Sequence, residues 1–346
     1  MHKYPSIEQF RHAIKNVART TQYDPDRAPE DTTPPAPLPS LLYRGTIKTH
    51  GTHGDIAFDE TLNIQVQSRN HILTEQSTNM GFWNFVVGIP ADDIKAFFRK
   101  IEQVCIGMPD FSHPIVISGE WCGRGIQKGV GISELDRFFI FYNIHYGPDD
   151  ARTWVDIARF TGVNLEAHRI FNILDFDHYE KMIDFERPDA ILNDLIHLTD
   201  EVEAACPVAV KIAAMDGRTL QIKTGEGLVW VCLNPAFASS QYWFKTKGDE
   251  HRGSKHAIGI EPEKAASIDQ FIKQTVTEPR LQQALTEMSL DITDKKFIGA
   301  FISWVYKDIL KEEYDTLKAS GLTGKDISNH VAKTATRWIR AQRANI

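Results

Sequence analysis

The stretch Lys48-Thr49-His50-Gly51-Thr52-His53-Gly54-Asp55 lies between two short apolar runs, Leu41–Tyr43 and Ile56–Phe58. Its two glycines allow a tight turn and let a ligand approach the main chain. A lysine two residues before a histidine, in a loop between strand-like runs, indicates an amine that is held for chemistry. For this octapeptide alone, a β-turn with a solvated lysine is the simpler interpretation. Residues further along the chain distinguish a reactive amine from a solvated lysine.

The composition is that of a globular protein. The 346 residues are 42% hydrophobic and 25% charged, which predicts a large core and two domains. No apolar run approaches the roughly 20 residues of a transmembrane helix, and Met1–Pro5 lacks the apolar core of a signal peptide. The four cysteines form no Cys-x-x-Cys pair, so we expect a cytoplasmic protein with reduced thiols.

The charge is unevenly distributed along the chain. The whole chain has a formal net charge of -7, whereas residues 262–346 contain 13 Lys and Arg against 11 Asp and Glu. This tail is therefore mildly basic and the remainder is acidic. Such a balance argues against indiscriminate binding of polyanions but allows local contacts with phosphate.

Residues 41–145 are expected to be rich in strands. Alternation and short apolar runs predict strands at Asn63–Gln67, Pro114–Ser118 and Arg137–Ile144. One helix, Ala91–Cys105, is predicted to interrupt them.

The next part of the chain adds a helix, predicted for Asp189–Ala205. Four further strands are predicted: Val208–Ala214, Leu220–Lys223, Gly227–Leu233 and Tyr242–Lys245. Strands with interleaved helices, but without regular βαβ alternation, predict an α+β fold with mainly antiparallel sheets.

Helical patterns mark both ends of the chain. Ser6 and Gln9 form a capping-box pattern that predicts a helix ending near Arg19, and the proline-rich residues 21–40 predict an extended linker. Beyond Pro262 the period is helical and strand signals vanish. We therefore expect three parts: residues 1–40, a main domain at 41–260 and a small helical domain at 261–346.

Four downstream segments combine charged or aromatic residues with glycine or with strand-like runs. They are Gly119-Glu120 with the following Gly123-x-Gly125-Ile126-Gln127-Lys128, the aromatic run that ends at Tyr142, Glu226-Gly227, and Lys245-x-Lys247. Singly, each has an ordinary explanation, because a lone glutamate is most often solvated and alternating lysines mark an exposed strand face. The ordered set is much more specific than any of its members.

In this order, Lys48-x-His50-Gly51-Thr52 and the four segments resemble the motifs of covalent nucleotidyltransferases, the superfamily of ATP-dependent ligases and mRNA capping enzymes. Within that superfamily, the segments at 48–52 and 119–128 resemble the RNA ligase 2 family of phages and kinetoplastid RNA editing. The resemblance covers about residues 41–248. It implies a nucleotidyltransferase domain and an ATP-dependent RNA ligase that joins RNA 3′-hydroxyl and 5′-phosphate ends, as in RNA repair.

The resemblance implies that Lys48 is the nucleophile, which forms a lysyl-AMP intermediate and releases pyrophosphate. An amine attacks phosphorus only when it is neutral, so nearby cations or burial must favour its deprotonation. Lys245, Lys247 and a Mg²⁺ or Mn²⁺ ion organised by Glu226 would do this and neutralise charge on the transferring phosphate. The AMP would then pass to an RNA 5′-phosphate, from which a 3′-hydroxyl displaces it.

The resemblance also implies the remaining residues of the ATP site. Glu120 would accept hydrogen bonds from the ribose hydroxyls, and Arg69 would clamp phosphate in the bidentate manner. Tyr142 would stack on adenine, with Phe141 as the alternative register. Ile47 would line the ATP site directly before the lysine.

Three positions depart from the family pattern. The family usually has an acid where this chain has Asn143, an asparagine where it has His53, and often a glutamate where it has Ile47. The resemblance implies that His50 and His53 engage the RNA 5′-phosphate. Because of the three departures, we expect this engagement and the adenine contacts to differ in detail from those of the family. A zinc site at the two histidines is not expected, because Asp55 is the only acid nearby.

The last helix of the tail carries a basic stripe, since Lys333, Arg337 and Arg340 recur at helical spacing. Val331, Ala335 and Trp338 recur at the same helical spacing on a separate face, which can pack on other helices. The stripe is expected to hold the RNA backbone, although an ordinary solvated helix surface gives the same pattern.

Three other functions stay open: a DNA ligase, a GTP-dependent capping-type nucleotidyltransferase, and a degenerate protein that only binds RNA ends. The helical tail lacks the β-rich segment that the first two would lead us to expect. The presence of Lys48, Glu120 and Glu226 argues against the third. We also expect a monomer without membrane contact, in the cytoplasm of a host cell if the chain is phage-encoded.

Overall fold

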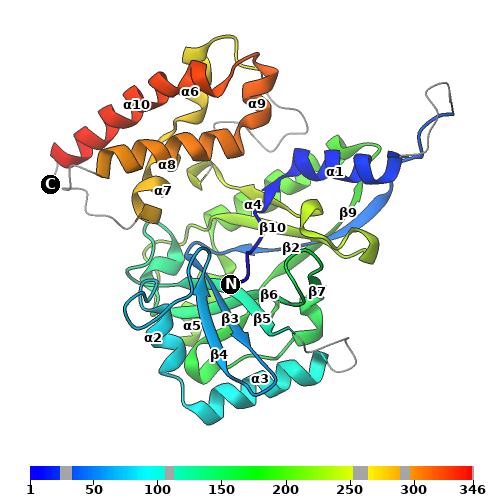
Figure 1. Ribbon diagram of the computed structural model, residues 1–346, viewed down its shortest axis with the longest axis vertical. Helices are drawn as coiled ribbons and strands as arrows, with labels where there is room; N and C mark the ends of the chain where they lie inside the picture. Colours follow the sequence, from blue (N-terminus) through cyan, green and yellow to red (C-terminus); the bar gives the residue numbers. More distant parts are fainter. Residues whose placement is uncertain (24–32, 106–112, 252–263, 289–296, 345–346) are drawn as a thin grey trace. The chain divides into compact units, whose positions relative to one another are not determined.

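The computed structural model describes residues 1–23, 33–105, 113–251, 264–288 and 297–344 (Figure 1). It confirms an α+β fold with mainly antiparallel sheets and a helical C-terminal region. The chain forms two compact units. The first contains Met1–Ile7, Ser40–Ile183 and Asp200–Lys245, and the second contains Glu8–Pro39, Asp184–Thr199 and Thr246–Ile346. Among the described residues, no helix has the length and apolar character that a membrane span requires.

The first unit is built on two sheets. One has the consecutive strands β11-β10-β2-β9, and the other has the order β4-β3-β5-β6-β7 with β8 parallel to β6. The strand bounds are β2 Ser40–Lys48, β3 Thr52–Phe58, β4 Ile64–Ser68, β5 Ile115–Cys122, β6 Phe138–Tyr146, β7 Thr153–Val155, β8 Ile170–Asn172, β9 His178–Asp184, β10 Gly227–Cys232 and β11 Phe244–Lys247. The strands predicted around residues 63–67, 114–118, 137–144 and 227–233 are confirmed.

In the described part of the chain, two α-helices lie between β4 and β5 of the second sheet, and two more lie between β9 and β10 of the first sheet. They are α2 Phe82–Val87, α3 Ala91–Cys105 and α5 Pro207–Met215, while α4 Leu192–Ala204 belongs partly to each unit. The predicted helix Ala91–Cys105 is confirmed at both ends. Its buried Phe98 stacks on Phe58 of β3 at a centroid distance of 4.4 Å, so α3 closes one face of the second sheet.

Two predicted strands are wrong. The run Val208–Ala214 is part of the helix α5, which begins at Pro207, where a missing N–H costs no hydrogen bond. The run Leu220–Lys223 is irregular, because the side chain of Glu134 accepts the N–H groups of Gln221 and Ile222 at 2.8 and 2.9 Å. The carboxylate thus accepts hydrogen bonds from the N–H groups that would otherwise pair with a neighbouring strand.

Other predicted bounds also change. The predicted strand Tyr242–Lys245 lies instead at Phe244–Lys247, after a short 3₁₀ turn at Ser240–Tyr242. The capping box at Ser6 is wrong, because α1 begins at Phe10 and its N-cap, Gln9, makes no side-chain capping bond. The predicted domain limit near residue 260 and much of the proline-rich linker lie outside the described residues. The three predicted domain ranges therefore stay a prediction.

One face of the first sheet is apolar. The ring of Tyr43 on β2 lies 5.3 Å from that of Phe244 on β11, and Phe244 stacks on Trp230 of β10. All three side chains are buried. Because side chains alternate along a strand, Lys48 on β2 and Lys245 on β11 both point to the opposite face of the sheet.

The second unit is helical in its described C-terminal part. Its helices are α1 Phe10–Gln22, α6 Ile268–Thr275, α7 Glu278–Met288, α8 Phe297–Glu312, α9 Tyr314–Ala319 and α10 Gly324–Ala344. The core between α6, α8 and α10 includes the fully buried Phe271, Phe301 and Val331. Helix α1 contacts α9, where Asp315 lies 2.8 Å from His12 and 2.7 Å from Lys15.

A buried charged cluster joins α7 to α8 and to the residue before α9. The guanidinium of Arg280, 1% exposed, donates to Asp308 Oδ2 at 2.8 Å, to Glu313 Oε1 at 3.0 Å and to the carbonyl of Thr275. Glu313 is itself 1% exposed. The arginine therefore neutralises a carboxylate that has no access to water.

Replacing Arg280 alone by methionine should destabilise the protein by about 3–5 kcal/mol, because it leaves the buried Glu313 carboxylate unpaired. The double variant Arg280→Met/Glu313→Leu removes both charges and should recover most of this loss. Urea unfolding of the full chain, followed by circular dichroism, measures both. Equal stabilities of the single and double variants would contradict the pairing.

Candidate active site

The catalytic candidate Lys48 is the last residue of β2, not a loop residue. In the antiparallel pair of β2 and β10, Lys48 lies opposite Gly227, the first residue of β10. Glu226 directly precedes β10, and its Oε2 accepts a hydrogen bond from Lys48 Nζ at 2.7 Å. Strand pairing thus brings together two residues that are 178 positions apart in the sequence.

Glu226 also contacts a second residue of the same stretch. His50 Nδ1 lies 3.2 Å from the same Oε2 atom, and Glu226 is only 3% exposed. A buried carboxylate is costly without a partner, so the lysine ammonium is a strong compensation for it.

Gly51 is held from two sides. Its N–H donates to Glu120 Oε1 at 3.2 Å, and its carbonyl accepts from Gln127 Nε2 at 3.0 Å. A Cβ at this position would lie 2.3 Å from the carbonyl oxygen of Trp121 and 2.8 Å from Cys122 Sγ. The loop can therefore pass the end of β5 only with glycine here.

Glu120 lies in the electrostatic field of the other site residues. Burial raises the pKa of its carboxyl group, Lys48 and His53 oppose this, and Glu226 adds to it. Its side chain is only half-buried by exposed area, so an acceptor-only carboxylate is available at the site.

His53 and Asp55 on β3 face the aromatic strand β6. His53 Nδ1 lies 2.9 Å from the hydroxyl oxygen of Tyr142, and His53 Nε2 lies 3.0 Å from Asp55 Oδ1. Gly54 between them packs against the ring of Phe82, which a Cβ would approach to 2.4 Å. His53 therefore does not share the carboxylate that His50 contacts, and the two histidines form no common site.

The aromatic strand contains a β-bulge at the site. Phe141 pairs with Gly119 and Asn143 pairs with Ser118, which leaves Tyr142 as the extra residue. A bulge turns two successive side chains toward the same side. Tyr142 and Asn143 accordingly contact the same residue, Tyr4: one through its ring, at 5.5 Å between centroids, and one through its side-chain oxygen.

The sequence prediction missed the N-terminal segment of the site. The hydroxyl of Tyr4 donates to Asn143 Oδ1, and its ring lies 4.8 Å from the ring of His53. The preceding His2 lies against His145 of β6, at 6.2 Å between ring centroids. No local pattern could have shown this, since Tyr4 is 139 residues from Asn143.

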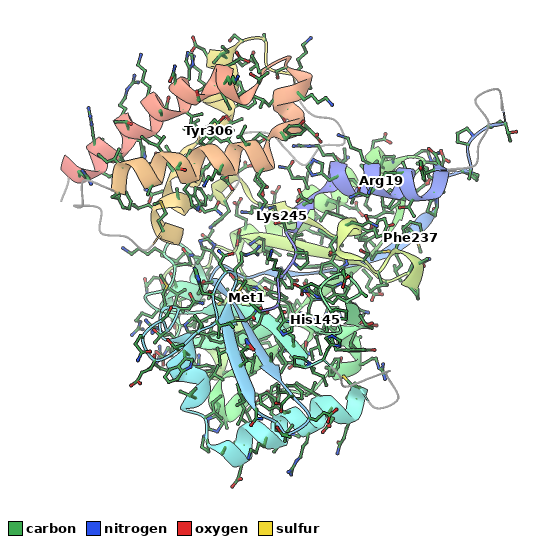
Figure 2. The ribbon with its side chains drawn as sticks, viewed as in Figure 1. Met1, Arg19, His145, Phe237, Lys245 and Tyr306 are labelled. Carbon is green, nitrogen blue, oxygen red and sulfur yellow. The ribbon has the colours of Figure 1, made fainter. Side chains whose placement is uncertain are left out.

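The other predicted ATP-site residues differ in their surroundings. Ile47 is 3% exposed and lies on the apolar face of the first sheet, opposite the face of Lys48. Lys245, which is labelled in Figure 2, is half-buried, and strand alternation places it on the face of Lys48. Lys247 is half-buried at the end of β11, where it belongs to the second unit. Arg69 is exposed just after β4, and its charge lowers the pKa of Tyr142, against the larger effect of burial.

The basic stripe lies on α10. Lys333, Arg337 and Arg340 are all exposed. The opposite face packs as predicted, since Val331 and Ala335 are fully buried and Trp338 stacks on Phe301 at 5.8 Å. The helix can therefore present three cations without disturbing its core.

Among the described residues, no group of three His, Cys, Asp or Glu side chains forms a ready-made metal site. The four cysteines are buried as free thiols, and burial raises the pKa of Cys122 well above its ordinary value. Thiolate chemistry is therefore not a property of this site.

The sequence from residue 43 to residue 247 matches the RNA ligase family. No curated protein sequence matches the chain. Similar solved structures include a Naegleria gruberi RNA ligase mutant with ATP and Mn, at 13% identity over 72% of this chain and 56% of that chain, with a TM-score of 0.43. Another is the Naegleria gruberi RNA ligase with PPi, at 12% identity over 72% and 58%, with a TM-score of 0.41. The chain thus covers less than two thirds of the length of these structures.

Substituting Gly51 by alanine should destabilise the protein by about 1–3 kcal/mol, because the added Cβ overlaps the backbone of Trp121. As a control, Gly299→Ala in α8 meets no atom within 4 Å and should stabilise the helix by about 0.5–1 kcal/mol. Chemical unfolding of both variants tests this. A neutral Gly51→Ala variant would show that the loop tolerates a side chain.

Proposed function

The chain belongs to the RNA ligase family, and from this membership we propose that it uses ATP to join an RNA 3′-hydroxyl to an RNA 5′-phosphate through an adenylylated lysine, Lys48. The observation that carries the proposal is the 2.7 Å contact between Lys48 Nζ and the buried Glu226, inside the part of the chain that matches the family. The hydrogen bond from the Gly51 N–H to Glu120 holds this second carboxylate near Lys48.

In the first step, the lone pair of Lys48 Nζ attacks the α-phosphorus of ATP. A P–N bond forms, the bond from the α-phosphorus to the bridging oxygen breaks, and pyrophosphate leaves with that oxygen. The lysine must first lose a proton, and Glu226 Oε2 is an acceptor 2.7 Å away. Lys245, on the same face of the sheet, and Lys247 would neutralise charge on the departing phosphates.

The remaining residues of the ATP site would bind and orient the nucleotide. Glu120 would accept hydrogen bonds from the ribose hydroxyls. The ring of Tyr142 would stack on adenine, and the exposed Arg69 would reach a phosphate. Ile47 contributes packing behind the lysine, because its side chain lies in the core and makes no direct approach to the face of Lys48.

A divalent metal ion, Mg²⁺ or Mn²⁺, would be held by Glu226 together with the phosphates of ATP. A single carboxylate with substrate oxygens and water suits Mg²⁺, which rarely uses an all-protein cage. The buried carboxylate of Glu226, next to Lys48, would supply such an oxygen donor. When bound, the ion supplies charge neutralisation at the transferring phosphate.

In the later steps, the AMP would pass to the 5′-phosphate of RNA, and a 3′-hydroxyl would displace it to seal the strand. His50 and His53 would help to engage the RNA 5′-phosphate, and the stripe on α10 would hold the RNA backbone. We further propose a role in RNA repair, a monomeric state, a cytoplasmic location, and an adenylylating domain at 41–260 followed by an RNA-engaging domain at 261–346.

Lys48→Ala and Lys48→Arg should both abolish covalent labelling by α-labelled ATP, because neither side chain supplies a neutral amine. The exposed Lys95→Arg variant should label like the unmodified protein. A denaturing gel measures the adduct, with and without EDTA. Labelling of Lys48→Arg at the unmodified level would refute the nucleophile, label from GTP in place of ATP would indicate capping chemistry, and no label from either would indicate a binding protein.

The triple variant Lys333/Arg337/Arg340→Ala should bind RNA with a shallower salt dependence and seal it at least tenfold more slowly, because fewer counterions are released on binding. Its adduct formation should be retained. The matched control, Lys273/Lys307/Lys318→Ala, removes three exposed lysines from α6, α8 and α9 of the same unit. Equal effects of the two triple variants on sealing would mean that only net charge matters.

A further inference from the structure

Three polar side chains of the second sheet, those of Asp55, His53 and Tyr142, contact one another in a row. Asp55 Oδ1 lies 3.0 Å from His53 Nε2, and His53 Nδ1 lies 2.9 Å from the hydroxyl oxygen of Tyr142. Asp55 is 1% and His53 6% exposed. Within the described residues, neither Asp55 Oδ1 nor His53 Nε2 makes a hydrogen bond of good geometry, so the 3.0 Å contact between them is the closest polar contact shown for these two buried atoms.

The other oxygen of Asp55 is bound by Gln67 of β4, which is itself held by the backbone of His2. Gln67 Nε2 donates to Asp55 Oδ2 at 2.7 Å and to the carbonyl of His2 at 2.6 Å. Gln67 Oε1 accepts from the backbone N–H of His2 at 3.0 Å. The amide can therefore present only its NH₂ group to Asp55, and the carboxylate is held in one orientation.

We propose that Asp55 is a positioning residue, which holds His53 with its Nδ1 atom directed at the Tyr142 hydroxyl. The protonation of His53 then decides whether this hydroxyl donates its hydrogen to the histidine or to a bound substrate. The inference deepens the proposed function and rests on it for the identity of that substrate, an RNA 5′-phosphate or its adenylate. Asp55 itself has no role in the ATP site described above.

The direction of each hydrogen bond follows from the two ring nitrogens. The carboxylate of Asp55 requires a proton on His53 Nε2 in either state of the ring. In the neutral ring, Nδ1 carries no proton, so it accepts the hydrogen of the Tyr142 hydroxyl. In the charged ring, Nδ1–H donates to the hydroxyl oxygen instead, and the tyrosine hydrogen becomes free to bind a phosphate oxygen.

The ionisation of the two flanking groups fits this scheme. Burial raises the pKa of Asp55, but the interactions with His53, followed by those with Ser118 and Gln67, outweigh it, so the net pKa is lowered and the carboxylate stays charged. Burial and the charge of Glu120 raise the pKa of Tyr142 well above its ordinary value. The hydroxyl therefore keeps its hydrogen at every working pH.

The other groups that face His53 come from every neighbouring element. Glu120 on β5 lies opposite His53 in the strand register, and its charge interacts with that of His53. The ring of Tyr4 packs on the imidazole, but its hydroxyl is directed to Asn143. Arg69 contributes an opposing positive charge to the same cluster, which is felt by Glu120 and Tyr4. Of the acidic side chains in the described part of the chain, Asp55 is the one that lies within 4 Å of a ring nitrogen of His53.

The first test does not depend on enzymatic activity. Histidine ring signals are followed by NMR across pH in the unmodified protein and in Asp55→Asn, with His53→Asn to assign the His53 signal. The His53 titration midpoint should move to lower pH by about one unit or more in Asp55→Asn, because the neighbouring negative charge is lost. The control Asp59→Asn, at an exposed turn after the same strand, should leave it unchanged. An unchanged midpoint in Asp55→Asn overturns the proposal.

The second test links the three contacting residues Asp55, His53 and Tyr142, here called the relay, to the reaction. Protein adenylylated beforehand is mixed with 5′-phosphate RNA, and AMP transfer is measured in single turnover from pH 5 to 9. The rate should fall at high pH, and in Asp55→Asn the fall should begin about one pH unit lower. Tyr142→Phe keeps the ring but lacks the hydroxyl, so it should be slower and lose this pH dependence; it also serves if Asp55→Asn does not fold.

The outcomes separate the two levels of inference. Matching pH profiles of the unmodified protein and the variants overturn the relay even if RNA is sealed normally. A shifted His53 midpoint in a protein that forms no lysyl-AMP refutes the proposed ligase function but supports the Asp55–His53 pair.

Discussion

The pairing of β2 with β10 is the constraint on which the site depends. It joins Lys48 to Gly227 across the strand pair, so Glu226 arrives beside the lysine without any local sequence signal. A slip of one residue would turn Lys48 to the apolar face that holds Tyr43 and Trp230. Because burying an unpaired carboxylate costs several kcal/mol, the ion pair and the strand register stabilise each other.

The second sheet solves a related problem with a different device. Its polar side chains lie close to a core that includes Phe82 and Phe141, and alternation alone would separate Tyr142 from Asn143. The β-bulge opposite Ser118 and Gly119 places both beside Tyr4. A backbone irregularity, which would weaken an ordinary strand pair, thus builds the polar end of the site.

The sequence predicts those features whose cause is local. Helix α3 was predictable because its apolar residues recur at helical spacing, and the strand β6 because of its aromatic run. The helix α5 was mistaken for a strand because its run Val208–Ala214 is short and apolar, and only the proline before it favours a helix start. The role of Tyr4 and the bulge at Tyr142 depend on contacts between distant segments, which no periodicity encodes. The residues near Lys48 were grouped through resemblance, not through spacing.

The division of the chain between the two units has a consequence for dissection of the protein. The chain passes from one unit to the other after residues 7, 39, 183, 199 and 245. Neither unit is therefore a continuous segment, and a cut near the predicted domain limit would remove only part of the second unit. The helix α1 would lose the Asp315 contacts of His12 and Lys15, and its apolar Phe10 and Val17 would stay behind in the fragment. Point substitutions, which preserve all five crossings, are the appropriate way to separate the contributions of the two units.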